Sequence, residues 1–431
     1  MMIRRTFRLS FGLIISSILL ISCSSTKALR SAGNELFAGK VLQTAHTGIS
    51  VFDVAAGRFV YDHQGDKYFV PASNTKIPTC YAAMKYLGDS ITAFRYSLRG
   101  KDTIVISGTG APDFLHPDFA RQDAFTFLKK FSHVYFSTQF YDEGLGSGWA
   151  WSDYQEYYMA RRSELPLYGN IVRFKWINPD SVSAVPSFFS KDAGIRASSL
   201  KNGFELHKPF DQNTFLFVDG TSKSAEVPFN PDINTITDLL RDTLKADVVP
   251  AVLQTNSFRF KSRPLDDVLQ PMMHRSDNFF AEQMLLMVSQ EKLGIMNDGK
   301  IIDTLLKTDF ASLPQKPRWA DGSGLSRYNL FSPQDLVFIL DKMQKEFGMN
   351  RIKTIFPTGG KGTLSNYYLE ESGQLFAKTG TLSGVVAISG FVYSKKGKLL
   401  IFSVLVNNHN GSATDVRHAV ECFIRKLREQ Q

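Results

Sequence analysis

The chain has 431 residues, which exceeds one average domain and suits two or three. Hydrophobic residues make up 43% and aromatic residues 13%, so there is enough apolar material for a large core. The formal net charge is +9, but the basic residues are spread along the chain and form no Lys/Arg-rich block. Nucleic-acid binding is therefore not expected, and the mild positive charge suits an anionic surface instead.

The N-terminus predicts a secretory signal peptide over residues 1–22. Three arginines within the first eight residues precede the apolar stretch 11–21, which is too short to span a bilayer. Leu20-Ile21-Ser22-Cys23 resembles the cleavage site of bacterial lipoproteins, in which the cysteine is lipidated. We therefore expect an exported, periplasmic protein held at a membrane through a lipid on Cys23. The alternative is an ordinary signal peptide with an incidental cysteine.

Two further cysteines, Cys80 and Cys422, follow in the chain. In an exported protein they could form one disulfide, or both could be buried thiols that pack as small hydrophobes. The histidines are scattered, and no cysteine–histidine cluster has the spacing of a metal site. No metal and no other cofactor is therefore predicted.

The first predicted elements are a hairpin and a helix. Residues Thr47–Val54 alternate as a strand does, Ala56-Gly57 suits a tight turn, and Arg58–Tyr61 return as a second strand. Ser73–Leu87 carries apolar residues at three- and four-residue spacing, which predicts a helix that Gly88 ends.

The middle of the chain, residues 95–245, is aromatic-rich and irregular. It predicts an inserted β-rich domain, and the flanking residues 24–94 and 246–431 are expected to form one larger domain. The stretches that indicate strands of the insertion are Asp102–Ser107, Val134–Ser137, Ile171–Trp176 and Thr214–Val218.

The C-terminal part predicts three strands followed by a helix over Thr414–Arg428, where Ser412 and Asp415 suggest a capping box. Strands from both ends of the chain can then form one antiparallel sheet, with terminal helices on one face and a helical cluster on the other. We therefore expect an α/β (α+β) fold. The three strands are Leu375–Leu382, Val385–Ser394 and Lys398–Asn407.

Three short motifs carry chemistry, and the first is Ser73-Asn74-Thr75-Lys76. Positions i and i+3 share a helix face, so the hydroxyl of Ser73 and the amine of Lys76 can approach each other. A serine hydroxyl becomes a good nucleophile when a base takes its proton, and a lysine kept partly neutral can be that base. The alternative is a helix start with Ser73 as cap and Lys76 solvated.

The second motif is Ser276-Asp277-Asn278, which precedes an apolar helical stretch. Ser276 could relay a proton to a leaving amine, and Asn278 could bond a substrate amide and Lys76. Alternatively, Ser276 is a helix cap and nothing more.

The third motif, Lys378-Thr379-Gly380, lies within a predicted strand. Lys378 can bind the terminal carboxylate of a peptide and polarise a neighbouring serine, and Thr379 can share that carboxylate. Gly380 would let a substrate backbone come close. The amide N–H of Thr381 could form an oxyanion hole with that of Ser73.

Together the motifs match the S-x-x-K, S-D-N and K-T-G set of penicillin-binding proteins and class A β-lactamases. The chain resembles the D-Ala-D-Ala carboxypeptidase/endopeptidase family of low-molecular-mass, class C penicillin-binding proteins. Four segments add to this resemblance: Val70–Lys76, Gly148–Asp153, His274–Glu282 and Asp321–Arg327.

The resemblance implies a penicillin-recognising, serine transpeptidase-like fold that acts on peptidoglycan stem peptides and is acylated by β-lactam antibiotics. It implies Ser73 as the acylated nucleophile, Lys76 as its base, and Asp153 as the candidate that recognises the amine of the third stem residue. The remaining catalytic and substrate-binding residues that it implies are Ser276, Asn278, Lys378, Thr379, Gly380 and Thr381.

Two alternatives stay open on the sequence. A β-lactamase or an esterase could use the same fold, but the one run similar to the E-x-x-L-N loop of class A β-lactamases, Glu164–Asn170, precedes the second motif instead of following it. A non-catalytic wall-binding lipoprotein would be free to lose Ser73, Lys76 or Lys378, yet all three are present.

Overall fold

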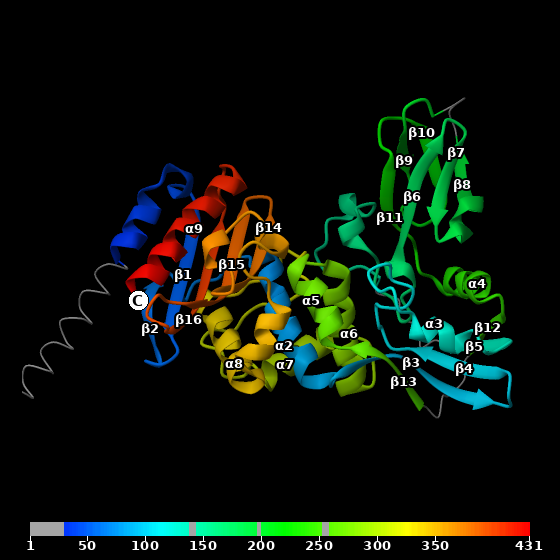
Figure 1. The fold of residues 1–431 in the computed structure, drawn as a ribbon, viewed down its shortest axis with the longest axis horizontal. Coiled ribbons are helices and arrows are strands. Elements are labelled where there is room, and N and C mark those ends of the chain that lie inside the picture. Colours follow the sequence, from blue (N-terminus) through cyan, green and yellow to red (C-terminus); the bar gives the residue numbers. More distant parts are fainter. Residues whose placement is uncertain (1–29, 138–143, 196–199, 252–257) are drawn as a thin grey trace, which may run out of the picture.

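The computed structural model describes residues 30–137, 144–195, 200–251 and 258–431. The predicted signal peptide, residues 1–22, and Cys23 lie outside the described residues. The chain forms a body, at the left of Figure 1, and an insertion at the right that is divided into an upper and a lower lobe.

The body is built on an antiparallel sheet in which strands from both ends of the chain are neighbours, in the order β14-β15-β16-β1-β2. This confirms the predicted sheet. The strands are rich in Val, Ile, Leu and Phe, and β14 is an outer strand, so one edge of its backbone pairs with no other strand of this sheet. The strands are β1 (His46–Asp53), β2 (Arg58–His63), β14 (Leu375–Leu382), β15 (Val385–Tyr393) and β16 (Leu399–Asn407).

Helices cover both faces of this sheet, as predicted. On one face, residues 30–38 and α9 (Ala413–Gln430) pack their apolar side chains against the strands. Ser412 caps α9 by accepting a hydrogen bond from the amide of Thr414. The helices on the other face are α2 (Lys76–Tyr86), α5 (Asp266–His274), α6 (Asn278–Leu293), α7 (Asp298–Lys307) and α8 (Pro333–Ile355). None of the described helices is both long and apolar enough to cross a membrane.

The insertion has its own apolar core, which joins its two lobes. The lower lobe is a mixed sheet in the order β12-β5-β4-β3-β13, and the upper lobe holds the sheets β11-β6-β7 and β8-β10-β9. Its elements are β3 (Ser90–Arg99), β4 (Thr103–Gly108), α3 (Asp123–Leu128), β5 (His133–Ser137), β6 (Ile171–Asn178), β7 (Ser181–Val185), β8 (Ala193–Ile195), β9 (Phe204–His207), β10 (Phe215–Asp219), β11 (Ser224–Pro228), α4 (Ile233–Leu244), β12 (Asp247–Ala251) and β13 (Phe258–Pro264).

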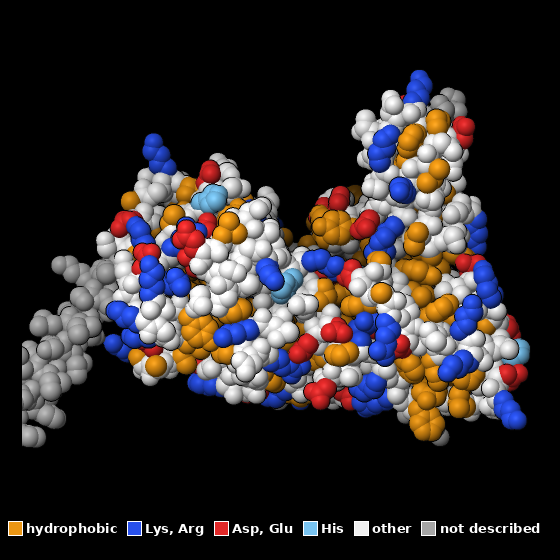
Figure 2. Space-filling model, viewed as in Figure 1, with side chains coloured by type: hydrophobic (Ala, Val, Ile, Leu, Met, Phe, Trp, Pro, Cys, Tyr) orange, Lys and Arg blue, Asp and Glu red, His pale blue; other side chains and the backbone are white. Residues whose placement is uncertain are grey.

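Strands β3 and β13 pair with each other and complete the lower lobe. Residues 95 and 245 were the limits expected for the insertion, but β3 begins before residue 95 and β13 ends after residue 245. We therefore propose to divide body from insertion near residues 89 and 265. The surface is hollowed between the body and the upper lobe (Figure 2).

The two described cysteines do not pair. Cys80 is buried on α2 as expected for a small hydrophobe, whereas Cys422 on α9 is exposed. The disulfide alternative is therefore wrong, and so is the expectation that both thiols are buried.

Candidate active site

The three motifs are spread over about 300 residues of chain, yet they meet in one site. The first two meet at the side chain of Lys76, and the third joins the second through Lys378. Lys76 Nζ donates to Ser73 Oγ at 3.0 Å, to Asn278 Oδ1 at 2.7 Å and to the carbonyl oxygen of Ser323 at 2.7 Å. Lys76 is fully buried and Ser73 is half-buried. A nucleophile open to a ligand therefore touches an amine that is shielded from water.

Ser73 lies in the 3₁₀ turn η2 (Ala72–Thr75) that leads into α2, so the predicted helix begins with a tighter turn. The backbone of Ala72 is left-handed (φ 46°), and Gly324 packs so closely that a Cβ there would lie 1.9 Å from Ala72 O. At Gly380 of β14 a Cβ would lie 2.9 Å from Ser73 N. Gly380 therefore lets β14 approach the Ser73 turn, a contact within the protein that differs from the contact with substrate expected from sequence.

Ser276 does not cap α6, because Asp277 does so by accepting from the amide of Phe280 at 3.0 Å. The backbone of Ser276 is left-handed (φ 62°), and its Oγ accepts from Lys378 Nζ at 2.8 Å. Lys378 also donates to the carbonyl oxygen of Thr379 at 2.6 Å. The capping alternative for Ser276 is therefore wrong, and its hydroxyl is held by the third motif.

Burial sets the proton affinity of both lysines. It lowers the pKa of Lys76 to about 8, although the carboxylates of Asp321, Asp277 and Glu282 act in the opposite direction. Burial, and then the charge of Lys76, lower the pKa of Lys378 well below its ordinary value. An ammonium with a lowered pKa is neutral for part of the time near neutral pH, which is what a general base requires.

Thr379 and Thr381 lie on the opposite face of β14 from Lys378, because side chains alternate along a strand. Thr379 Oγ1 contacts Thr363 Oγ1 at 2.7 Å. Thr381 Oγ1 accepts from Arg417 Nη2 at 2.9 Å. Thr379 is half-buried and Thr381 is exposed, and both line a pocket at the edge of β14.

Asp153 ends the short 3₁₀ helix η3 (Trp151–Asp153) of the insertion and is half-buried. It accepts from Tyr158 OH at 3.0 Å, and the carbonyl oxygen of Tyr158 accepts from Asn278 Nδ2 at 3.1 Å. Burial and the bond to Asp153 raise the pKa of Tyr158 to about 12, so its hydroxyl remains a donor. Asp153 is therefore linked to the second motif through one intervening residue, Tyr158.

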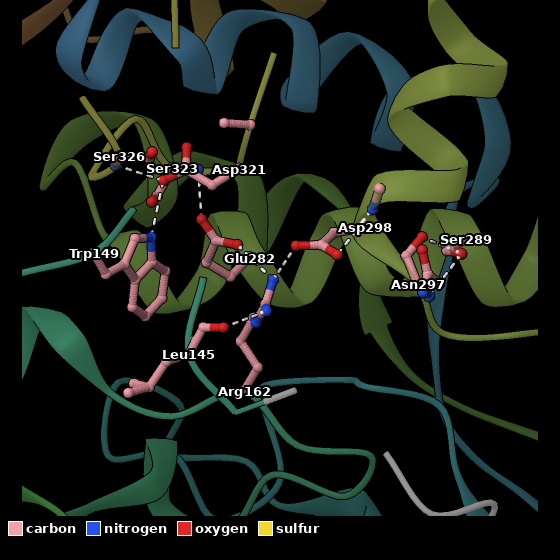
Figure 3. Close-up of polar contacts among 12 residues, drawn as sticks. Leu145, Trp149, Arg162, Glu282, Ser289, Asn297, Asp298, Asp321, Ser323 and Ser326 are labelled. Atoms are coloured by element: carbon pink, nitrogen blue, oxygen red, sulfur yellow. Dashed lines mark hydrogen bonds and ion pairs between the residues drawn. The ribbon is translucent and has the colours of Figure 1, made fainter. Parts of the chain in front are cut away.

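Sequence reasoning missed a buried charge network that connects the insertion to Glu282 and Ser323 (Figure 3), and through Ser323 to Lys76. Arg162 of the insertion bonds Glu282 and Asp298, and Glu282 Oε1 accepts from the amide of Ser323 at 2.7 Å. The carbonyl oxygen of Ser323 in turn accepts from Lys76. Burial raises the pKa of Glu282 to about 7, and the charge of Asp321 adds to this. One signal in the sequence was Glu282 itself, an acid among the mostly apolar residues of the first three turns of α6.

Asp321 organises the loop that carries Ser323, as its Asp-Gly-Ser-Gly turn pattern suggests. The carboxylate is fully buried and accepts four N–H bonds. One of these donors, the indole of Trp149, comes from the insertion (Figure 3). The others belong to Gly324, Ser326 and Asn329.

Among the described residues, no group of three or more His, Cys, Asp and Glu side chains is placed to hold a metal ion. A half-buried serine beside a buried amine, at the outer strand of an antiparallel sheet, is an arrangement suited to nucleophilic attack by the serine and acyl transfer.

The chain belongs to the D-Ala-D-Ala carboxypeptidase 3 (S13) family, whose sequence model matches residues 32–427. It is accordingly a serine peptidase. The chain is 26% identical over 455 aligned residues to the D-alanyl-D-alanine carboxypeptidase of Actinomadura sp. (strain R39), covering 89% of this chain and 82% of that protein.

The fold is similar to that of penicillin binding protein 4 (dacB) from Haemophilus influenzae, with a TM-score of 0.72 at 20% identity, over 91% of this chain and 98% of that one. A second structure of the same protein, in complex with a β-lactam, gives a TM-score of 0.68 at 18% identity over 93% and 98% of the two chains. The penicillin-recognising fold expected from sequence is thereby confirmed.

We predict that acylation of the enzyme by a fluorescent penicillin speeds up as pH rises and levels off above about 8, because the base must lose its proton and Lys76 has a pKa of about 8. The measurement is the second-order rate constant of labelling from pH 6 to 10. A rate that is independent of pH across this range would contradict the assignment of Lys76 as base.

Two variants sharpen this test. Lys76→Ala should slow labelling by about 100-fold or more, because the base is lost. Glu282→Gln keeps an oxygen for the amide of Ser323 but removes a charge that raises the pKa of Lys76, so the rise in rate should begin at lower pH.

Proposed function

We propose that the protein hydrolyses the terminal D-Ala-D-Ala bond of peptidoglycan stem peptides through an acyl-enzyme on Ser73. The observation that carries this proposal is the 3.0 Å contact between Lys76 Nζ and Ser73 Oγ. Neutral Lys76 takes the hydroxyl proton as Ser73 Oγ attacks the carbonyl carbon of the penultimate residue.

The tetrahedral intermediate that forms carries a negative oxygen. The amides of Ser73 and Thr381 are the proposed donors to this oxygen, and the close approach of β14 to the Ser73 turn supports their pairing. As the intermediate collapses, the C–N bond breaks and the leaving amine takes the proton of the Ser276 hydroxyl, which in turn receives the proton that Lys76 took from Ser73. Lys378 holds the Ser276 hydroxyl during this relay.

Release of D-alanine leaves an ester on Ser73. Water then attacks the ester carbonyl, the C–O bond to Ser73 breaks, and the serine oxygen regains a proton, so that the enzyme is restored. A β-lactam acylates Ser73 by the same attack, but its opened ring stays attached to the acyl group. It therefore acts as an inhibitor that leaves slowly.

Cross-links between stems present the same kind of D,D-peptide bond, so DD-endopeptidase activity is part of the proposal. Digestion of purified cell wall with separation of the muropeptide products measures the two activities side by side. Asn278, through its contact with Lys76 and the insertion, is proposed to bind the amide of the acyl donor.

The family acts on the bacterial cell wall, so the protein is exported. A lipid anchor on Cys23 is our further proposal, supported by the lipoprotein-like run Leu20-Ile21-Ser22-Cys23. Cells that express the full chain should incorporate labelled palmitate into the wild-type protein and not into Cys23→Ser. Equal incorporation in both would exclude this anchor.

Stable labelling by fluorescent penicillin should occur in the wild-type protein and be absent in Ser73→Ala, because the acylated oxygen is gone. The check is gel fluorescence on protein whose thermal unfolding matches the wild type. Persistent labelling of Ser73→Ala would refute the assigned nucleophile. Rapid turnover of the antibiotic by the wild type would favour a β-lactamase.

Asp153 is proposed to bind the amine of the third stem residue, since it is half-buried and accepts from Tyr158, whose carbonyl oxygen accepts from Asn278 of the second motif. Asp153→Ala should lower hydrolysis of an amine-bearing stem peptide roughly 10-fold, the size of one hydrogen bond to a charged group, and leave penicillin acylation nearly unchanged. Glu156→Ala, an exposed acid three residues on, is the matched control. Equal loss of both reactions in Asp153→Ala would remove it from substrate recognition.

A further inference from the structure

Apolar side chains reach the surface at the lower edge of the lower lobe (Figure 2). Phe258, which begins β13, is 64% exposed, and Leu98, near the end of β3, is 51% exposed. The ring centroid of Tyr96 lies 5.5 Å from that of Phe258 and 5.2 Å from that of Phe127 on α3. These four residues, Tyr96, Leu98, Phe127 and Phe258, form the apolar ridge. Exposed apolar residues that occur singly need no explanation, whereas a contiguous group of them points to an interaction site.

Strand register places the members of the apolar ridge on one face of the sheet. Phe258 pairs directly with Tyr96, and opposed residues of an antiparallel pair share a face. Leu98 lies two residues beyond Tyr96 and shares that face as well, because side chains alternate along a strand. Phe94, two residues before Tyr96, is buried in the core of the insertion, where its ring stacks on Phe127. The apolar face that forms this core therefore continues outward to Leu98 and Phe258, which folding leaves exposed.

Positive charge gathers around the apolar ridge. Lys130 Nζ lies 5.9 Å from the ring centroid of Phe127. Ser132, two residues further on, donates its amide N–H to the carbonyl oxygen of Asp102 at 3.0 Å, so the loop after α3 lies against the turn between β3 and β4. The end of α3 and this turn carry four exposed cations: Arg99, Lys101, Lys129 and Lys130.

Among the described residues, these four cations have no carboxylate partner. The acids on the neighbouring elements are engaged elsewhere: Asp123 of α3 pairs with Arg121, and Asp247 of β12 contacts His133. Asp102 is the one acid within the turn itself. This end of the lobe therefore carries an excess of positive charge beside an apolar surface, and the charge is free to meet anions outside the protein.

We propose that the apolar ridge docks on the surface of an anionic lipid bilayer. Leu98 and Phe258 enter the boundary between headgroups and acyl chains, and the four cations meet lipid phosphates. The contact is separate from the peptidase reaction and does not depend on a lipid at Cys23. Together with such a lipid it supplies the second of the two attachments that stable membrane anchoring takes.

Charge complementarity selects a bilayer as the occupant. Its phosphates are the anions that the four cations lack within the protein, and the acyl layer directly beneath them accepts leucine and phenylalanine side chains. A second copy of this chain docked through the same surface would bring its own cations against these four, and like charges facing each other weaken an interface.

The test is co-sedimentation with lipid vesicles of the chain from residue 24 onward, which includes every described residue and lacks Cys23. Vesicles of phosphatidylglycerol and phosphatidylcholine should bind the protein. Vesicles of phosphatidylcholine alone, which carry no net charge, should bind it roughly 10-fold more weakly or less, because each Lys or Arg near an anionic surface adds several-fold to binding. Binding to the anionic vesicles should fall as salt is added, because salt screens exposed charges.

Variants locate the contact on the apolar ridge. Phe258→Ser and Leu98→Ser should each weaken binding to anionic vesicles roughly 10-fold, the size expected when one large apolar side chain no longer leaves water. The double variant Lys129→Gln/Lys130→Gln should weaken it by a similar factor, roughly 10-fold, at low salt. All four side chains are largely exposed, so the fold should persist, and thermal unfolding checks that it does.

Two matched controls should bind vesicles as the wild type does. Leu369→Ser changes a leucine of the body that is 59% exposed, and Lys395→Gln/Lys396→Gln neutralises an adjacent exposed pair at the turn between β15 and β16. Every variant should keep wild-type labelling by fluorescent penicillin, so the outcome is distinct from a failure of the proposed function.

The proposal is refuted if anionic vesicles do not bind the wild-type protein, or if Phe258→Ser and Leu98→Ser bind them as well as the wild type does. A dimer in sedimentation equilibrium that Phe258→Ser abolishes would also refute it, because the apolar ridge would then be an interface between two copies of the chain.

Discussion

Two ammonium groups buried among neutral oxygen atoms are the constraint on which the structure depends. Lys76 bonds a hydroxyl, an amide oxygen and a backbone carbonyl, and Lys378 bonds a hydroxyl and a backbone carbonyl. A buried cation without a paired carboxylate is costly unless its donors are satisfied. The fold satisfies them, and the cost that remains lowers the pKa of both lysines.

The acceptors come from four parts of the chain, which is why the site requires the whole body of the protein. Ser73 lies in the turn before α2, Ser276 and Asn278 lie at the start of α6, Ser323 lies in the loop before α8, and Thr379 lies on β14. The carboxylate of Glu282 does not contact the amine of Lys76 and reaches it only through Ser323. Glu282 holds the amide of Ser323 and does not touch the amine, so it moderates the charge of the site without neutralising it.

The insertion also contributes side chains to the buried surroundings of Lys76. Arg162 and Trp149 reach from it to Glu282 and Asp321, and Tyr158 accepts from Asn278. The same segment carries Asp153. The insertion is thus joined by hydrogen bonds to the residues that hold Lys76. Figure 3 shows the part of this set that runs through Arg162, Glu282 and Ser323.

Local sequence patterns predicted much of the secondary structure of the body and part of the active site. The strands of the body and α9 were predicted to within about two residues, because alternation and three-to-four spacing are properties of neighbouring residues. The spacing of Ser73 and Lys76 placed hydroxyl and amine together for the same reason. The contacts between segments that lie far apart in the chain could not be predicted from these local patterns.

Tertiary packing alone decided those contacts. It showed that Gly380 makes room for the Ser73 turn, that Asp277 caps α6 in place of Ser276, and that Glu282 supports Ser323. It also brought Arg417, unremarkable on an amphipathic helix, to the hydroxyl of Thr381. Sequence determines which side chains a strand or helix can offer on each face, but which partner they meet depends on how the elements pack, because those partners lie far apart along the chain.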